Sequence, residues 1–215
     1  MPHTLTVISE FECHYGCPYC YSYNHSNRTS TVDSLNSLNK YVNAFNIDTL
    51  ILSGSGDPLY RCNKHIDYFD KFLEIGKYNN VKLHIETSFV PHMLTTYGHG
   101  LLSQFDNIEY HLHNYSQLKE IKHIKNVNQV VSFLITPNTT PELLESIIWF
   151  VRKSDCIDFV LFKQMVGPKF TPLHICEYYT DALNTDCSEF VTFKDEGLYY
   201  MENMIYSKLS SIYKF

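Results

Sequence analysis

Short apolar segments alternate with helical patterns six times between residues 4 and 167, and this alternation constrains the fold more than any other feature. Helical patterns cover residues 32–45, 66–75, a stretch opening at Pro91, residues 117–124 and residues 140–151. The predicted strands are Thr4–Ser9, Thr49–Ser53, Val81–Glu86, Asn107–Leu112, Gln129–Ile135 and Ile157–Phe162. Such alternation predicts a parallel sheet with right-handed crossovers.

Two arrangements fit these six units. Continuous apolar strands such as Leu50–Leu52 and Phe159–Phe162 predict a sheet covered on both faces. Six units are too few for a closed eight-stranded barrel, so a partial barrel competes with a doubly wound sheet. No internal repeat, linker or low-complexity tract interrupts the pattern.

Composition narrows the class of protein. The 215 residues are 44% hydrophobic, which suits one folded domain of moderate size. The formal net charge is −6 and no Lys/Arg run exceeds two neighbours, which argues against duplex nucleic acid as a partner but allows a nucleotide-like small molecule. The N-terminus lacks the pattern of a signal peptide, and no apolar stretch reaches the ~18–20 residues of a membrane span. We therefore expect a cytoplasmic protein with no membrane partner.

Three of the seven cysteines lie within eight residues, directly after the first predicted strand. In a reducing compartment this spacing favours metal binding over disulfides. Cys13, Cys17 and Cys20 can hold three corners of a 4Fe–4S cluster and leave the fourth iron open, as a catalytic metal requires. The alternatives are a zinc site completed by His14 or His25, or cysteines without a ligand.

The motif Cys13-x3-Cys17-x2-Cys20, with the aromatic Tyr19 before the last cysteine, resembles the signature of radical S-adenosylmethionine (SAM) enzymes. The resemblance covers residues 4–167 and implies an α/β fold, a partial (βα)6 barrel of radical SAM type. It also implies an oxygen-sensitive 4Fe–4S cluster whose open iron binds SAM. In that family the reduced cluster cleaves SAM to a 5′-deoxyadenosyl radical, which abstracts hydrogen from the substrate. By resemblance Tyr19 lies near the adenine, whereas packing alone is the simpler role.

A second resemblance lies after the second predicted strand. Gly54-Ser55-Gly56-Asp57-Pro58 is similar to the family's Gly-Gly-Glu-Pro loop, which binds the SAM amino group. Glycines let backbone groups approach a ligand closely. Ser55 and Asp57 depart from the commonest form of that loop, and a plain turn is the alternative.

Polar residues end several of the predicted strands, where ligands gather in parallel α/β folds. In the family such residues contact the SAM carboxylate and ribose, and the alternative is ordinary core or surface packing. The candidates for SAM binding are Glu86, Ser88, His111, Ser132 and Gln164, with His113 and Lys163 as further possibilities.

The resemblance implies a radical SAM enzyme acting on a small-molecule or nucleotide-like substrate, with an electron donor such as flavodoxin or ferredoxin. An enzyme like 7-carboxy-7-deazaguanine synthase is one alternative, supported by Glu86-Thr87 and the length. Tyr21-Ser22 stands where that group carries Asp and Thr for magnesium, which weakens the match. The sequence is also compatible with a glycyl-radical activating enzyme and with a non-catalytic iron–sulfur or SAM-binding protein.

The resemblance does not reach residues 168–215, and we treat them as a C-terminal extension of a core spanning residues 1–167. Glu189–Phe193 predicts a strand, and Gly197–Tyr213 predicts a helix rich in Tyr and Met. Because the chain leaves the sixth strand at its carboxyl end, we expect the extension to flank the active site. The alternative is packing outside the barrel to extend the sheet. We expect most of the remaining cysteines to be small buried hydrophobes: Cys62, Cys156, Cys176 and Cys187. The alternative is a second cluster built from Cys176 and Cys187 with another cysteine.

Overall fold

The structure is a computed structural model of the 215-residue chain. The residues that it describes are 3–17, 32–54, 56–90, 93–136, 138–164, 190–194, 197–202 and 205–208. Among them, no helix is both long enough and apolar enough to span a bilayer.

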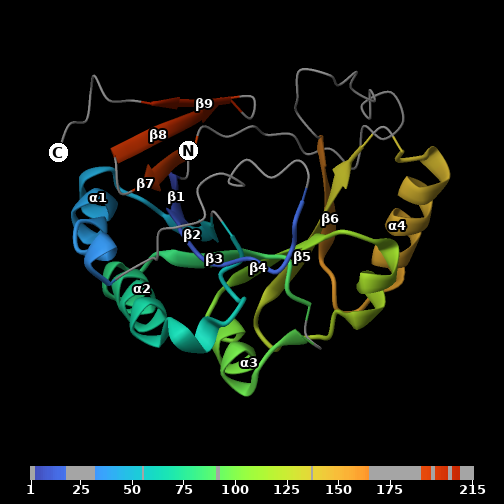
Figure 1. The fold of residues 1–215 in the computed structure, drawn as a ribbon, viewed down its shortest axis with the longest axis horizontal. Helices are drawn as coiled ribbons and strands as arrows, with labels where there is room; N and C mark the ends of the chain where they lie inside the picture. The colour runs from blue at the N-terminus through green and yellow to red at the C-terminus, as the bar shows by residue number, and fades with distance from the viewer. Residues whose placement is uncertain are drawn as a thin grey trace.

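Six parallel strands form the core of the molecule, side by side in chain order (Figure 1). They are β1 (Thr4–Ser9), β2 (Thr49–Gly54), β3 (Lys82–Thr87), β4 (Asn107–Leu112), β5 (Asn128–Ile135) and β6 (Phe159–Gln164). Each neighbouring pair is parallel, from β1 with β2 to β5 with β6. The six-strand parallel sheet predicted from the sequence is therefore confirmed.

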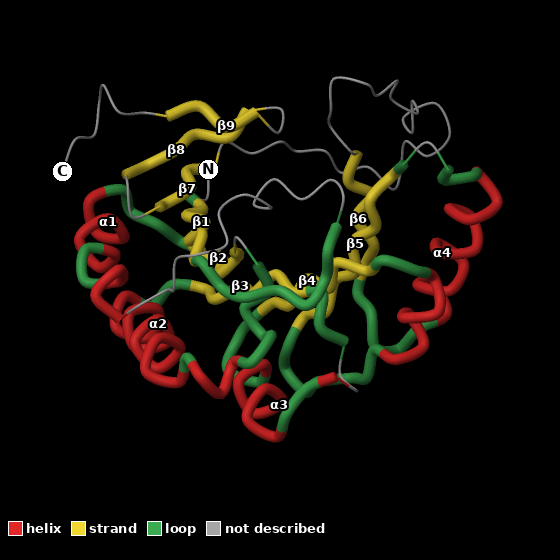
Figure 2. Tube along the Cα trace, in the orientation of Figure 1, coloured by secondary structure: helices red, strands yellow, loops and turns green. Residues whose placement is uncertain are grey.

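The helices lie along the outer, convex side of the curved sheet (Figure 2). They are η1 (Val32–Leu35), α1 (Leu38–Ala44), η2 (Cys62–Lys64), α2 (Ile66–Asn79), α3 (Thr96–Leu102), η4 (Tyr115–Glu120) and α4 (Pro141–Lys153). The expectation of a sheet covered on both faces is wrong for the described residues, whose helices cover one face only. The fold is an open, partial (βα)6 barrel, and the doubly wound alternative is wrong.

Side chains alternate across each strand, and the outward set makes the hydrophobic core. These residues are almost fully buried between the sheet and the helices: Leu5, Val7, Leu50, Leu52, Leu83, Ile85, Ile108, Tyr110, Val131 and Phe133. From the helix side, Phe69 and Phe72 of α2 are completely buried. The apolar runs seen in the sequence thus reflect burial of one face, with Ile51 and Leu161 of the opposite face only half-buried.

Local sequence explains where two of the helices begin. The Thr140 hydroxyl accepts a hydrogen bond from Leu143 N at 3.3 Å and Pro141 is the first residue of α4, as predicted. Helix α3 begins at Thr96, where the Thr95 hydroxyl accepts from Gly98 N at 3.1 Å. The helix expected from Pro91 thus starts later, and Pro91 itself lies outside the described residues.

The C-terminal extension adds three strands to the β1 edge of the sheet. Strand β7 (Phe190–Lys194) pairs parallel with β1, and β8 (Gly197–Glu202) and β9 (Ile205–Lys208) follow antiparallel. The strand predicted near Glu189–Phe193 is confirmed, but the helix predicted over Gly197–Tyr213 is wrong in its described parts. Tyrosine is a residue that favours strands, and pairing with an open sheet edge decides the outcome. A role beside the active site stays a prediction.

Candidate functional site

The concave face of the sheet gathers several polar side chains, beside half-buried apolar residues such as Ile51 and Leu161. Strand register places them together, because Glu86 pairs with Glu109 and His111 pairs with Ser132. Ser53 of β2 joins them, since its hydroxyl donates to Glu86 Oε2 at 2.8 Å. Two of these residues are almost completely buried, Glu109 and Ser132, at 3% exposure each.

His111 lies between two carboxylates. Its Nε2 is 3.0 Å from Glu109 Oε1 and 3.9 Å from Glu86 Oε2. The three ligand atoms, one from each residue, all lie within 4.8 Å of one another. Glu86 and His111 were predicted from the sequence, whereas Glu109 was missed. Strand alternation could have predicted Glu109, because it lies two positions before His111 on β4 and so shares the same face of the sheet.

The cysteine loop leaves the carboxyl end of β1 over a buried aromatic anchor. The Phe11 ring stacks on Phe69 of α2, with centroids 5.8 Å apart. Beyond it, Cys13 is exposed and Cys17 is half-buried, and Tyr15 N donates a hydrogen bond to Cys13 Sγ at 3.4 Å. The remaining residues of the motif, among them Tyr19 and Cys20, lie outside the described residues.

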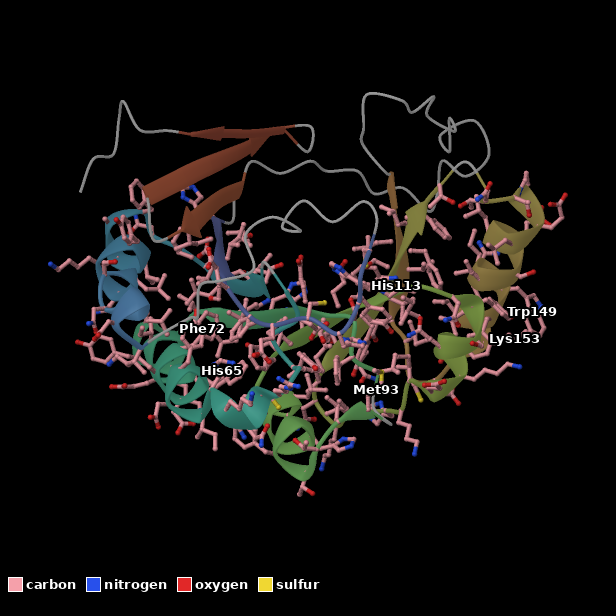
Figure 3. All side chains as sticks on the ribbon, in the orientation of Figure 1. His65, Phe72, Met93, His113, Trp149 and Lys153 are labelled. Carbon is pink, nitrogen blue, oxygen red and sulfur yellow. The ribbon has the colours of Figure 1, made fainter. Side chains whose placement is uncertain are left out.

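The two residues after Cys13 fasten the loop across the carboxyl ends of β3 and β4. The His14 ring lies edge-on to Phe89, with centroids 4.4 Å apart. The Tyr15 ring stacks on His113 at 4.0 Å, and its hydroxyl accepts from Gln117 Nε2 at 3.2 Å. His113, which Figure 3 labels, directly follows β4. Burial lowers the pKa of His14 and of His113 and raises the pKa of Tyr15, so all three rings favour their neutral forms.

The glycine loop after β2 packs directly on the chain that leads to the cysteines. A Cβ at Gly54 would lie 2.9 Å from Ser9 O, and one at Gly56 would lie 1.9 Å from Phe11 O. The backbone of Asp57 then donates to Glu12 O at 3.1 Å. The glycines are therefore needed to bring the two loops together, and Ser55 between them lies outside the described residues.

Asp57 joins the glycine loop to the end of β3. Its carboxylate accepts from Leu59 N at 2.9 Å, from the Thr87 hydroxyl at 2.8 Å and from Ser88 N at 2.6 Å. Burial raises the pKa of this carboxyl, and the three hydrogen bonds and nearby His14 oppose the rise. Asp57 was predicted to bind SAM. In the structure its carboxylate accepts hydrogen bonds that connect the glycine loop to the residues at the end of β3.

The structure describes the side chains of some of the other candidate residues and not of others. Ser88 is half-buried after β3, while Lys163 and Gln164 belong to β6 but their side chains lie outside the described part. Cys62 is fully buried in the core, as predicted, and burial raises the pKa of its thiol. Cys156 is half-buried and packs against the core. Cys176 and Cys187 are outside the described residues.

Comparison with known proteins supports the fold and leaves the family open. No protein-family model and no curated protein matches the chain. Among solved structures, the chain is similar to native anSMEcpe with bound AdoMet (SAM) and the Cp18Cys peptide, with a TM-score of 0.58 and 17% identity. The match covers 78% of this chain and 52% of that one, so the chain spans about half the length of the protein it matches.

Proposed function

We propose that this chain is a radical SAM enzyme, with Cys13, Cys17 and Cys20 holding a 4Fe–4S cluster. The observation that carries the proposal is the position of the cysteine loop. It leaves β1 at the carboxyl ends of six parallel strands and is fastened there by His14 and Tyr15. Ligands of parallel α/β folds bind at this edge. The similar structure that carries AdoMet supports the same kind of fold.

The described residues fit such a cluster. Cys13 and Cys17 are accessible rather than packed into the core, unlike Cys62. The hydrogen bond from Tyr15 N to Cys13 Sγ is of the kind that stabilises a cluster thiolate and tunes its potential. When bound, the reduced cluster supplies the electron that cleaves SAM to a 5′-deoxyadenosyl radical.

The chain's own residues hold the cofactor and keep water away. The proposed SAM contacts are Tyr19, Gly54, Ser55, Gly56, Glu86, Ser88, His111, Ser132 and Gln164. Asp57 acts indirectly, because its three hydrogen bonds hold the glycine loop against the end of β3. The His14 ring packs against Tyr60 and Phe89 beside the cysteine loop, and this packing would help to shield a reactive species from solvent. The proposed substrate is a small or nucleotide-like molecule, and a flavodoxin or ferredoxin would supply the electron.

Anaerobic reconstitution with iron and sulfide tests this proposal. The full chain should bind about four irons, and Cys→Ala at position 13, 17 or 20 should lose most of them. Cys62→Ala and Cys156→Ala are matched controls, which should retain iron because neither residue belongs to the loop. With SAM and dithionite, the reconstituted chain should release 5′-deoxyadenosine, and candidate substrates should accelerate that release.

Two outcomes would contradict the proposal. Colourless protein with one tightly bound zinc would indicate a structural zinc site in its place. A full cluster without any SAM cleavage would indicate a non-catalytic iron–sulfur protein.

A further inference from the structure

We infer that Glu86, Glu109 and His111 form a binding site for a divalent transition-metal ion on the inner face of the barrel. None of the three donors belongs to the cysteine loop, so binding of the ion can be tested without the cluster. For Glu86 and His111 this role replaces the direct contact with SAM given above, and the other proposed SAM contacts are unchanged. The inference rests on geometry, donor chemistry and burial.

The spacing of the donor atoms suits a metal. An ion with ligands at about 2.1 Å places neighbouring ligand atoms about 3.0 Å apart in octahedral geometry and about 3.4 Å in tetrahedral geometry. His111 Nε2 is 3.0 Å from Glu109 Oε1 and 3.9 Å from Glu86 Oε2. Small side-chain rotations would bring the three donors onto one ion.

An ammonium group of a substrate fits this spacing less well. Donating three hydrogen bonds of about 2.9 Å in tetrahedral directions, it would set its acceptors about 4.7 Å apart. The two measured separations are shorter than that. Imidazole nitrogen and carboxylate oxygen are both donors that zinc and related ions accept, and three protein ligands leave positions open for a small ligand.

Burial favours a cation at this place. Glu109 is 3% exposed, and the Glu86 side chain is 19% exposed. Two carboxylates brought together away from water repel each other, and an ion of charge +2 compensates both. Glu86 and Glu109 are register partners on adjacent strands, so the sheet backbone holds them together whether or not an ion is bound.

A further residue supports the ligands from behind. The Ser53 hydroxyl donates to Glu86 Oε2 at 2.8 Å and fixes that carboxylate in place. Hydrogen bonds of this kind orient metal ligands, and their loss typically weakens binding by about 10–100-fold. Ser53 therefore provides a graded test beside removal of the ligands themselves.

The test uses the full chain with Cys13, Cys17 and Cys20 all replaced by Ala, stripped by a chelator and titrated with Co²⁺. Nitrogen and oxygen ligands give visible d–d bands without the sulfur charge-transfer bands of thiolate ligation. We expect one Co²⁺ per chain, displaced by Zn²⁺. In this background, Glu109→Gln and His111→Gln should each weaken binding at least about 100-fold, and Ser53→Ala about tenfold.

His123→Gln is the matched control, because His123 is exposed and is not one of the three donor residues, so the affinity of this variant should equal that of the parent. Thermal unfolding of each variant confirms that it is folded. Absence of Co²⁺ binding, thiolate bands from the remaining cysteines, or unchanged affinity in Glu109→Gln and His111→Gln would each overturn the inference. Because the cluster ligands are removed from the start, these results are independent of the proposed SAM chemistry.

Discussion

The two faces of the sheet come from the same strands, yet the chemistry of their side chains differs. The outward set, exemplified by Ile85 and Ile108, is completely buried beneath the helices. The inward set, one residue along, includes Glu86 and Glu109. Because strand side chains alternate strictly, one short segment serves both purposes. The outer face provides the free energy of folding, and the inner face gathers groups that the core could not tolerate.

Ile85 and Glu86 are neighbours on β3 that face opposite sides of the sheet. Substitutions at these two positions should show the largest difference in the free energy of unfolding. Ile85→Ala leaves a cavity beneath the helices and should lower the free energy of unfolding by about 2–5 kcal/mol. Glu86→Gln keeps the shape of the side chain and an oxygen to accept from Ser53, but it removes the carboxylate charge 3.9 Å from His111 Nε2, so its change should be about 1 kcal/mol or less. Urea unfolding of both variants measures the two values. Equal losses in the free energy of unfolding would show that residues of the inner face contribute as much to stability as those of the core.

Asp57 is buried against the end of β3, and it tests whether a buried polar group also contributes to stability. Asp57→Asn turns an amide N–H toward Ser88 N and loses a hydrogen bond to a charged acceptor, which costs about 1.5–3 kcal/mol. Burial raises the pKa of Asp57 in the folded state, so its contribution is complete below the pKa of the unfolded chain and is lost as pH rises through the folded value.

The wild type should therefore gain stability relative to Asp57→Asn as pH falls through the acidic range. Unfolding of both proteins at several pH values measures this difference, in which the titrations common to both proteins cancel. A difference that stays constant, or that narrows toward low pH, would show that hydrogen bonding outweighs burial at this carboxyl.

The sequence predicted the strands well, because each carries apolar residues either as a run, as in β2, or in alternation with polar residues, as in β3. It predicted less well which strand residues face the helices. Leu50–Leu52 is a continuous apolar run in the sequence, although Ile51 faces the opposite side from Leu50 and Leu52. Glu86 and His111 were recognised from their strand-end positions, but Glu109 was not, because it lies inside β4. Strand pairing, which sequence periodicity alone does not specify, brings it to Glu86. The strands β8 and β9 escaped prediction for the same reason, since an edge of β1 supplies the pairing through β7.

The glycine loop offers a matched pair of substitutions near the cysteines. Gly56→Ala would put a Cβ 1.9 Å from Phe11 O, so the loop must move, at a cost of about 1–3 kcal/mol. Gly16→Ala should be tolerated, because nothing lies within 4 Å of its added Cβ. Under the proposed function, Gly56→Ala should also retain less iron after reconstitution than Gly16→Ala. Equal stability and iron content in the two variants would mean that the loops are not held together in this way.

The smallest expected effect concerns the contacts that Tyr15 of the cysteine loop makes with His113 and Gln117. Tyr15→Phe keeps the ring stacked on His113 but removes the hydroxyl that accepts from Gln117 Nε2. Gln117 Oε1 still accepts from His113 N and Asn114 N, so only one partner of this amide is lost. One such hydrogen bond is worth about 0.5–1.5 kcal/mol, and urea unfolding should show a loss of that size. His113→Ala alone and combined with Tyr15→Phe complete a double-mutant cycle, which separates the ring contact from the hydrogen bond. If the two losses add without coupling, the hydroxyl and the stacked rings fasten the loop independently. A Tyr15→Phe variant with undiminished stability would show that the stacking alone holds the cysteine loop over β4.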